Sequence, residues 1–408
     1  MNRTVHVVLP GSIDDPAAPS GGNRYDRRLC DGLLARWDVH EIAVAGAWPH
    51  PSAAARRALA GALQGVPDGS SVLLDGLVAC AVPDLLEPVA SRLRLVVLVH
   101  LPLGDEIGLA PADAAALRAL ERRALHAAAA VIATSAGAAR RLVGLHDLPA
   151  DRVHTAAPGV DREPLAAGSP AGGRLLCVAA VTPRKAQDVL LDALAAVVDL
   201  AWSCVCVGAL DRAPDFAAAL SERACGWPGG ERAARGWPAG ERATSGWPGG
   251  ERATRSWPGG ERAARGWPGG ERAAADRSAG SPDGERVRFV GTRTGAELEA
   301  TYAAADLLVL PSRAEPYGMV VTEALAHGIP VLATAVDGVP EALGTAPDGS
   351  VPGVLVPPGD AGALAAAIRR WLTDAAWRAR LRASARARRH NLRGWDETIR
   401  RVSEVLGR

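Results

Sequence analysis

Short runs of apolar and β-branched residues alternate along this chain with longer stretches, rich in Ala, Leu and Arg, that are long enough for helices. The alternation occurs in two blocks and is typical of parallel sheets whose strands are connected by helices. In the first block we predict strands at 3–9, 38–44, 71–75, 94–99, 130–134 and 152–156. In the second block we predict them within 174–181, 202–210, 286–291, 306–312, 329–336 and 353–359. The sequence therefore predicts an α/β protein with two doubly wound parallel sheets.

The stretch GVDREPLAAGSPAGG, residues 159–173, separates the two blocks and is rich in Gly and Pro. Such a composition predicts a hinge between domains. We expect an N-terminal Rossmann-like domain over residues 1–165 and a C-terminal one over residues 170–390. A length of 408 residues is sufficient for two such domains.

A ten-residue unit containing Trp-Pro is repeated over residues 226–272 and interrupts the second block. Its Gly and Pro residues disfavour both helix and strand, and its period is too short for the common solenoid repeats. One interpretation is a tandem duplication of coding sequence, tolerated because long surface insertions cost little loop-closure entropy. The other is a Trp-Pro array that binds a partner. Both remain open at this point.

Charge and cysteine content narrow the function classes. A net charge of +1 gives no field that would attract a polyanion, so we expect no nucleic-acid partner. The six cysteines form no C-x-x-C pair, which predicts reduced core thiols rather than disulfides or a zinc site. The N-terminus has no signal-peptide core and no apolar run approaches the ~20 residues of a membrane span. A cytoplasmic protein is therefore expected.

The sharpest motif is SRAEPYGMVVTEALAHGIPVLAT, in which Glu315 and Glu323 are separated by seven residues. It follows the predicted strand DLLVLPS, and ligands bind open α/β sheets at the carboxyl ends of strands. Pro316 suits the first turn of a helix, so we expect Glu315 at the helix N-terminus. The backbone N–H groups of Gly318, Met319 and Val320 would then attract phosphate, and the two carboxylates could accept hydrogen bonds from sugar hydroxyls.

This E-x7-E motif, with PSRAEPYG and ALAHGIPVLAT around it, resembles the retaining GT-B glycosyltransferases of family 4. The resemblance implies the GT-B fold, in which two Rossmann-like domains face a cleft. It implies that Glu315 contacts the donor sugar and Glu323 the nucleotide ribose. It also implies that the terminal segment, residues 391–408, is a helix that packs back on the N-terminal domain.

Lys185 is the only lysine, because the other 45 of the 46 Lys and Arg residues (46 − 1) are arginines. The family has a lysine at this place, in the loop after the first strand of the C-terminal domain, where it pairs with the donor diphosphate. A compact ammonium group suits a phosphate contact, although a solitary lysine could arise by chance. The loop departs from the family pattern at Ala180, where arginine is frequent, and at Ala186, where glycine is usual. Arg184 is our candidate for the second positive charge.

Further residues of the predicted site follow from the same resemblance. The Gly21-Gly22 pair, expected between the first strand and the first helix, matches the glycine-rich loop that lets backbone approach the donor phosphates and the acceptor. His100, directly after the strand RLVVLV, matches a histidine that lines the donor-sugar site. Gly291 and Thr292 are expected beside the nucleotide base. Glu341 matches a family glutamate, although Asp337 replaces a frequent glycine nearby.

We predict a retaining hexosyltransferase with a UDP- or GDP-sugar as co-substrate, no other cofactor and no bound metal. Its catalytic residues would be His100, Lys185 and Glu315. The donor, the acceptor and the oligomeric state are not specified by the sequence. The alternatives are a sugar-nucleotide epimerase or hydrolase on the same fold, and a catalytically degenerate protein that binds a partner through its repeats. The arginine-rich C-terminal stretch is interpreted as a solvated face, with peripheral contact to an anionic membrane as the lesser alternative.

Overall fold

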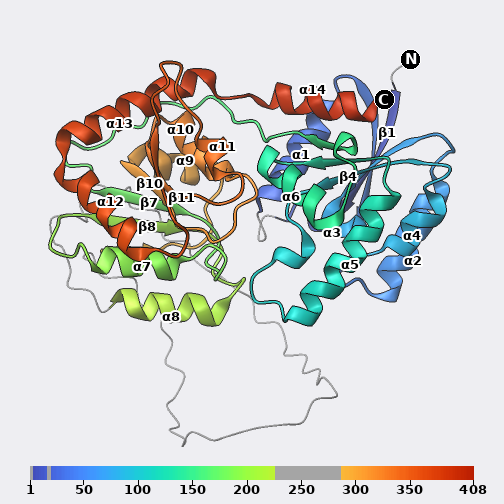
Figure 1. The fold of residues 1–408 in the computed structure, drawn as a ribbon, viewed down its shortest axis with the longest axis horizontal. Helices are drawn as coiled ribbons and strands as arrows, with labels where there is room; N and C mark the ends of the chain where they lie inside the picture. The colour runs from blue at the N-terminus through green and yellow to red at the C-terminus, as the bar shows by residue number, and fades with distance from the viewer. Residues whose placement is uncertain (1–2, 16–19, 226–285) are drawn as a thin grey trace, which may run out of the picture.

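The computed structural model describes residues 3–15, 20–225 and 286–408, which form two six-stranded parallel sheets (Figure 1). The first sheet has the strand order β2-β1-β3-β4-β5-β6. Its strands are β1 (Arg3–Pro10), β2 (Trp37–Val44), β3 (Ser71–Asp75), β4 (Arg94–Val99), β5 (Ala130–Ala133) and β6 (Val153–Thr155). All six lie where the alternating apolar runs predict them.

The second sheet has the order β12-β11-β10-β7-β8-β9 and is also parallel throughout. Its strands are β7 (Arg174–Val178), β8 (Ser203–Val207), β9 (Val287–Phe289), β10 (Leu307–Leu310), β11 (Val331–Thr334) and β12 (Gly353–Val356). Each lies within a predicted run. The prediction of two doubly wound parallel sheets is therefore confirmed. The repeats of residues 226–272 lie outside the described residues, in the connection that leads to β9.

Helices cover both faces of the first sheet, because its strands are apolar on both sides. One face packs on α2 to α6, and the other packs on α1 and α14. The helices of this half are α1 (Gly21–Leu33), α2 (Ala53–Gly65), α3 (Gly76–Ala79), α4 (Pro83–Leu86), α5 (Pro111–Ala127) and α6 (Ala136–His146). Helix α14 (Trp395–Leu406) comes from the end of the chain, and Figure 1 shows it lying over this half.

The second sheet is covered in the same way. The helices α7, α8 and α12 pack on one face, α9, α10 and α11 pack on the other, and α13 contributes to both clusters. The helices are α7 (Gln187–Ala195), α8 (Pro214–Cys225), α9 (Gly295–Ala304), α10 (Met319–Ala326), α11 (Val339–Leu343), α12 (Ala361–Thr373) and α13 (Ala375–Arg388). No described helix is both long and apolar enough to span a bilayer.

The strand orders fix where each domain can hold a ligand. In the first sheet the order in which successive strands are added reverses between β1 and β3. In the second sheet it reverses between β7 and β10. At such a switch point the loops leaving two neighbouring strands diverge to opposite faces and leave room between them. The loops after β1, β3, β7 and β10 are therefore the places where functional residues are expected to gather.

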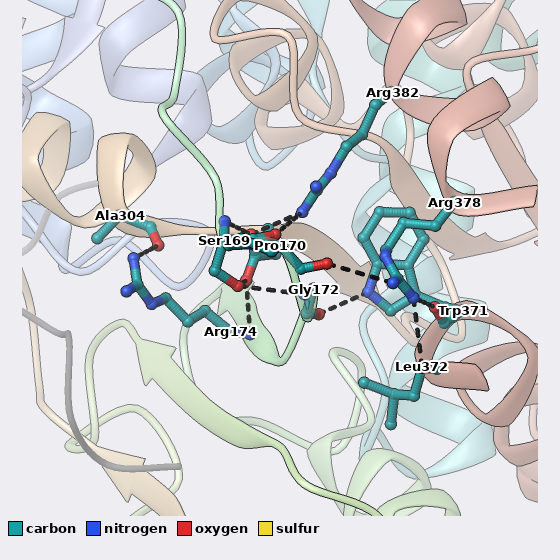
Figure 2. Close-up of polar contacts among 10 residues, drawn as sticks. Ser169, Pro170, Gly172, Arg174, Ala304, Trp371, Leu372, Arg378 and Arg382 are labelled. Carbon is teal, nitrogen blue, oxygen red and sulfur yellow. Dashed lines mark hydrogen bonds and ion pairs between the residues drawn. The ribbon is translucent and has the colours of Figure 1, made fainter. Parts of the chain in front are cut away.

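The end of the predicted hinge is fastened to the C-terminal domain by polar contacts, and Figure 2 shows those of Ser169 with Arg382 and of Gly172 with Trp371. The central acceptor is the buried side chain of Asp306. Its carboxylate accepts hydrogen bonds from the Ser169 hydroxyl at 2.6 Å, the Arg174 amide at 2.9 Å and the Arg382 guanidinium at 2.8 Å. Trp371 adds a hydrogen bond from its indole nitrogen to the Gly172 carbonyl at 2.7 Å. Residues 169–174 are thus part of the second domain's packing rather than a free linker.

The arginines of α13 and the segment after it form the solvated face that the sequence suggested only in part: Arg380 and Arg386 are exposed, but other arginines contact the protein. Arg378 is 8% exposed and donates to the Trp371 carbonyl at 2.7 Å. Arg388 donates to the Leu343 carbonyl, and Arg389 to the Ala326 carbonyl. Guanidinium groups offer five N–H donors and can satisfy carbonyls left open at helix ends. Helical periodicity alone gives no sign of these carbonyls.

None of the six cysteines, all within the described residues, forms a disulfide. Five of them are buried, as predicted, but Cys225 is exposed. It is the last residue of α8, where the described chain leaves the domain before β9. The prediction of a core thiol is therefore wrong for this one position, because the end of a helix that precedes a long connection is not covered by neighbouring elements.

Candidate functional site

The switch point of the second sheet brings Lys185 and Glu315 together. Lys185 follows β7 and Glu315 follows β10, and these two strands are neighbours. The Lys185 ammonium forms an ion pair with Oε2 of Glu315, and the Ser312 hydroxyl donates to the same oxygen at 3.2 Å. The side chains of Lys185 and Glu315 are 15% and 12% exposed, so both groups stay within reach of a ligand.

The sequence suggested that Glu315 lies at the N-terminus of the helix, but it does not. Helix α10 begins at Met319, and Glu315 and Pro316 belong to the loop before it. The residue before a proline is disfavoured in helical conformation, and Gly318 makes the turn into the helix with a φ of 94°. The Glu315 amide donates to Asp337 at 2.9 Å, and the Gly338 amide donates to the Glu315 carbonyl at 3.2 Å. These contacts hold the loop in place.

Glu323 lies in α10 with its carboxylate 11% exposed. Its Oε2 accepts a hydrogen bond from the Tyr302 hydroxyl at 2.8 Å, and its Oε1 accepts one from the Arg24 guanidinium at 2.7 Å. Burial, and then the neighbouring Glu323 carboxylate, raise the pKa of Tyr302 well above its usual value, so the phenol stays a donor. Because Arg24 belongs to α1, this ion pair connects the two domains.

Gly21 and Gly22 are the first two residues of α1 rather than part of the loop before it, because Ser20 caps the helix by accepting from the Asn23 amide at 3.0 Å. A side chain at Gly22 would crowd a neighbour, whereas one at Gly21 would make an ordinary contact. A Cβ on Gly22 would lie 3.2 Å from Cδ2 of His100, and one on Gly21 would lie 3.6 Å from the sulfur of Met319. The first residues of α1 and α10 therefore lie close together across the domain boundary.

His100 follows β4 and is held by two buried carboxylates. Its Nε2 lies 2.8 Å from Oδ1 of Asp26 and 3.8 Å from Oδ2 of Asp75. Burial of the ring lowers its pKa, but Asp26, and then Asp75, outweigh this effect and raise the pKa of His100 to about 9. Burial, and then Asp26, raise the pKa of Asp75 well above its usual value. Asp26 therefore favours protonation of the His100 ring, and burial favours protonation of Asp75.

Three predicted residues lie apart from these contacts. Arg184 extends from the second domain to Glu106 of the first at 3.3 Å and donates to the Ala314 carbonyl at 3.3 Å. Gly291 and Thr292 follow β9, which is separated from β7 by β8. The Gly291 carbonyl accepts from the Gly208 amide at 2.9 Å, which places it beside the end of β8.

Further contacts join the two domains. The Ser135 hydroxyl donates to the Pro316 carbonyl at 2.7 Å, and the Ala136 amide donates to Oε2 of Glu341 at 2.7 Å. Ala136 is the first residue of α6, so Glu341 accepts from a helix N-terminus, where a carboxylate is favoured. The loop that carries Glu315 is therefore fixed by residues of both domains.

The sequence reasoning missed Arg24, Asp26, Asp75 and Tyr302. A signal existed for Asp75, because it ends the buried strand SVLLD and the strand-end rule applies to it. Arg24 and Asp26 flank Tyr25 in the first turns of α1. This helix has several charged residues, and the sequence does not show which of them point toward the site. Tyr302 lies in α9, and its partner Glu323 could be identified only from the packing of α9 on α10.

Two groups of side chains within the described segments have ligand atoms close enough to share a metal ion: Asp26, Asp75 and His100, and Glu163, Glu299 and His327. Metal ligands must be deprotonated, and the pKa values of His100 and Asp75 are both raised. Protons therefore compete with a metal ion for the first group. In the second group, His327 Nε2 lies 3.0 Å from Glu299.

Comparisons with known families cover both domains. A family model described as Glycosyltransferase Family 4 matches residues 19–164, and one described as Glycosyl transferases group 1 matches residues 266–374. A protein of Frankia alni named D-inositol 3-phosphate glycosyltransferase is 31% identical over 293 residues, 69% of this chain and 59% of that protein. One with the same name from Salinispora tropica is 43% identical over 123 residues, 30% of this chain and 24% of that protein. The matches thus span less than two thirds of these relatives.

Solved structures resemble the whole fold. HepE of Anabaena in complex with UDP and glucose has a TM-score of 0.67 at 16% identity, and the match covers 99% of both chains. A sucrose-phosphate synthase of Thermosynechococcus elongatus has a TM-score of 0.68 at 20% identity and covers 99% of this chain and 98% of that one. At such identities the likeness concerns the fold.

Proposed function

Because the chain belongs to the family 4, or group 1, glycosyltransferases and has their GT-B fold, we propose that it transfers a sugar from a nucleotide-diphosphate donor to a hydroxyl acceptor. The single observation that carries this proposal is the cluster at the second switch point. There Lys185, Glu315 and the start of α10 lie together between β7 and β10. The cation and the helix N-terminus suit a phosphate, and the carboxylate suits the hydroxyls of a sugar attached to it.

The donor would bind with its diphosphate against the Lys185 ammonium and the amides of Gly318, Met319 and Val320. Amides at a helix N-terminus lack intrahelical partners and favour anions. Glu315 would accept hydrogen bonds from the donor sugar, and Glu323 would accept them from the ribose hydroxyls. The base would lie toward Gly291 and Thr292. His100 would contact the sugar from the other domain.

We propose that the reaction retains the anomeric configuration. As the bond between the anomeric carbon and the phosphate oxygen breaks, that oxygen would take the acceptor's proton, and the acceptor oxygen would bond to the same face of the sugar. The protein's part is then to stabilise charge on the leaving diphosphate, which Lys185 and the α10 amides can do. The ion pairs of Glu315 with Lys185 and of Glu323 with Arg24 support this role. They show that each carboxylate of the motif lies beside a cation that could contact the diphosphate.

For the donor we propose a UDP-sugar. A structural neighbour, HepE, was solved with UDP-glucose as well as with UDP and glucose. For the acceptor, the first compounds to test are inositol phosphates, because several relatives carry the name D-inositol 3-phosphate glycosyltransferase. The N-terminal domain, over which the family 4 model matches residues 19–164, would bind the acceptor.

The test is a transfer assay with UDP-sugars in the presence and absence of candidate acceptors, read by UDP release and by proton NMR of the product. The proposal predicts acceptor-dependent UDP release and a product with the donor's anomeric configuration. Free sugar without any acceptor would indicate a hydrolase, and a new sugar nucleotide would indicate an epimerase. An inverted product would contradict the retaining mechanism while leaving the transferase assignment intact.

A further inference from the structure

The two glutamates of the motif are each paired with one cation, and the two cations come from different domains. Lys185, which pairs with Glu315, belongs to the C-terminal domain. Arg24, which pairs with Glu323, belongs to α1 of the N-terminal domain. The sequence suggested Arg184 as the second positive charge, but Arg184 extends to Glu106 and the Ala314 carbonyl instead. We therefore propose that Arg24 supplies the second positive charge to the donor diphosphate, from across the domain boundary.

The surroundings of Arg24 favour an anion. Arg24 lies one turn into α1, whose first residue, Gly21, lies close to Met319, the first residue of α10. A helix N-terminus carries partial positive charge, so two that lie close together favour an anion beside them. Met319 belongs to the core clusters of both domains, so the two helix starts are held together by packing. A diphosphate between them would meet Lys185 on one side and Arg24 on the other.

Arg24 also has donors to spare. Among the described residues, its guanidinium makes one hydrogen bond, from Nη1 to Oε1 of Glu323, while a guanidinium carries five N–H groups. Its side chain is 39% exposed, so the other nitrogens are open to a ligand. Arginine binds phosphate through two parallel hydrogen bonds, which a single lysine cannot do. The geometry suits a residue that can hold Glu323 and a phosphate together or move from one to the other.

This inference rests on the proposed function, in which Glu323 accepts hydrogen bonds from ribose. When ribose hydroxyls donate to Glu323, they would replace the Arg24 hydrogen bond and free the guanidinium for the phosphates. The competing possibility is that Arg24 only occupies Glu323 and must be displaced before a nucleotide binds. The two possibilities predict opposite effects of removing Arg24 on nucleotide affinity.

The experiment compares wild type, Arg24→Ala and Arg24→Lys by calorimetric titration with UDP and with uridine, which lacks the phosphates. We expect Arg24→Ala to weaken UDP binding at least about 10-fold, the usual size for a charged hydrogen bond, while uridine binding stays the same or improves. Arg24→Lys should recover part of the loss. Unchanged or tighter UDP binding by Arg24→Ala would overturn the inference and leave Arg24 as a competitor for Glu323.

The matched control is Arg27→Ala on the same helix. Arg27 pairs with Asp14 at 2.7 Å and Glu41 at 2.8 Å within the N-terminal domain, so its loss removes a charge without reaching Glu323. A second test repeats Arg24→Ala in a Glu323→Gln background. If Arg24 contacts phosphate directly, the 10-fold loss persists there; if it acts only through Glu323, the loss disappears. Should wild type bind no nucleotide at all, the proposed function fails first, and that result is distinct from failure of this inference alone.

Discussion

The Nε2 atom of His100 lies 2.8 Å from Oδ1 of Asp26, at the place where the end of β4 meets α1. Asp26 is 2% exposed, so its carboxylate acts through a medium that screens charge poorly. The contact predicts that Asp26→Asn lowers the pKa of His100 from about 9, because burial favours the neutral ring and only Asp75 then still favours the charged one. Nitrogen NMR of the imidazole over pH 5–10 would measure this.

The control for that measurement is Asp38→Asn. Asp38 lies 3.1 Å from the exposed His40, so its loss changes a histidine contact far from His100. An unchanged His100 titration in Asp26→Asn would contradict the electrostatic account of this pair.

The same pair predicts how stability depends on pH. The pKa of His100 in the folded protein, about 9, lies above its ordinary value of 6.5. Folding therefore favours the protonated ring, and this contribution to the free energy of unfolding is complete below about pH 6.5 and is lost as the pH rises through about 9. Urea unfolding at several pH values should show the loss in wild type and a flatter profile in Asp26→Asn. Parallel profiles for the two proteins would refute the linkage.

Lys185→Ala should weaken the binding of nucleoside diphosphates at least about 10-fold, because it removes a charge-assisted hydrogen bond to phosphate. The measurement is a calorimetric titration with UDP and GDP. Arg369→Ala is the matched control, since Arg369 pairs with Asp199 on the exposed surface of the same domain at 2.7 Å. Equal affinity of Lys185→Ala and wild type would remove Lys185 from the site.

Gly338→Ala should destabilise the protein by about 1–3 kcal/mol through overpacking. A Cβ at this position would lie 2.1 Å from the Pro316 carbonyl oxygen, although the backbone there has an ordinary φ of −91°. The strain falls on the loop that carries Glu315. Thermal unfolding would report the lower midpoint.

Gly61→Ala provides the comparison for Gly338→Ala. Gly61 lies inside α2 with nothing within 4 Å of its added Cβ, so this change should stabilise the helix by ~0.5–1 kcal/mol. If Gly338→Ala is as stable as Gly61→Ala, the loop accommodates the added methyl group without strain, and the prediction is wrong.

Asp306→Ala should lower the free energy of unfolding by about 3 kcal/mol or more, because it leaves the Arg382 guanidinium and the Arg174 amide without their buried acceptor. The denaturation midpoint in urea would fall, and Asp306→Asn should recover part of the loss. Asp199→Ala, which removes the exposed partner of Arg369, should leave the midpoint unchanged within error. Similar midpoints for Asp306→Ala and Asp199→Ala would mean that residues 169–174 are not held in place by Asp306.

The strands could be predicted from the sequence because a strand buried on both faces is a short apolar run, whatever its neighbours are. The proximity of Lys185 and Glu315 followed from the rule that ligands bind at strand ends, together with the family resemblance. The order of the strands could not be predicted in this way, and this order is what makes β7 and β10 neighbours.

Contacts that depend on tertiary packing could not be predicted from the sequence. The Arg24–Glu323 pair joins residues 299 positions apart in different domains. The Asp26–His100 contact depends on which face of α1 turns toward β4. The start of α10 was misplaced because a proline in a helix's first turn and a proline in the loop before it look the same locally. The Gly318 φ of 94° decides between them.

The most direct test of the central claim is a thermal-shift screen of the purified protein against UDP-, GDP-, ADP- and TDP-sugars and the free diphosphates. At about 100 times Kd a ligand adds about 2.7 kcal/mol to the stability of the folded state. For domains of this size that corresponds to a rise of several degrees. The account predicts a selective rise with one nucleotide, expected to be UDP, that is lost in Lys185→Ala. A folded protein whose melting temperature responds to none of these compounds would contradict the account.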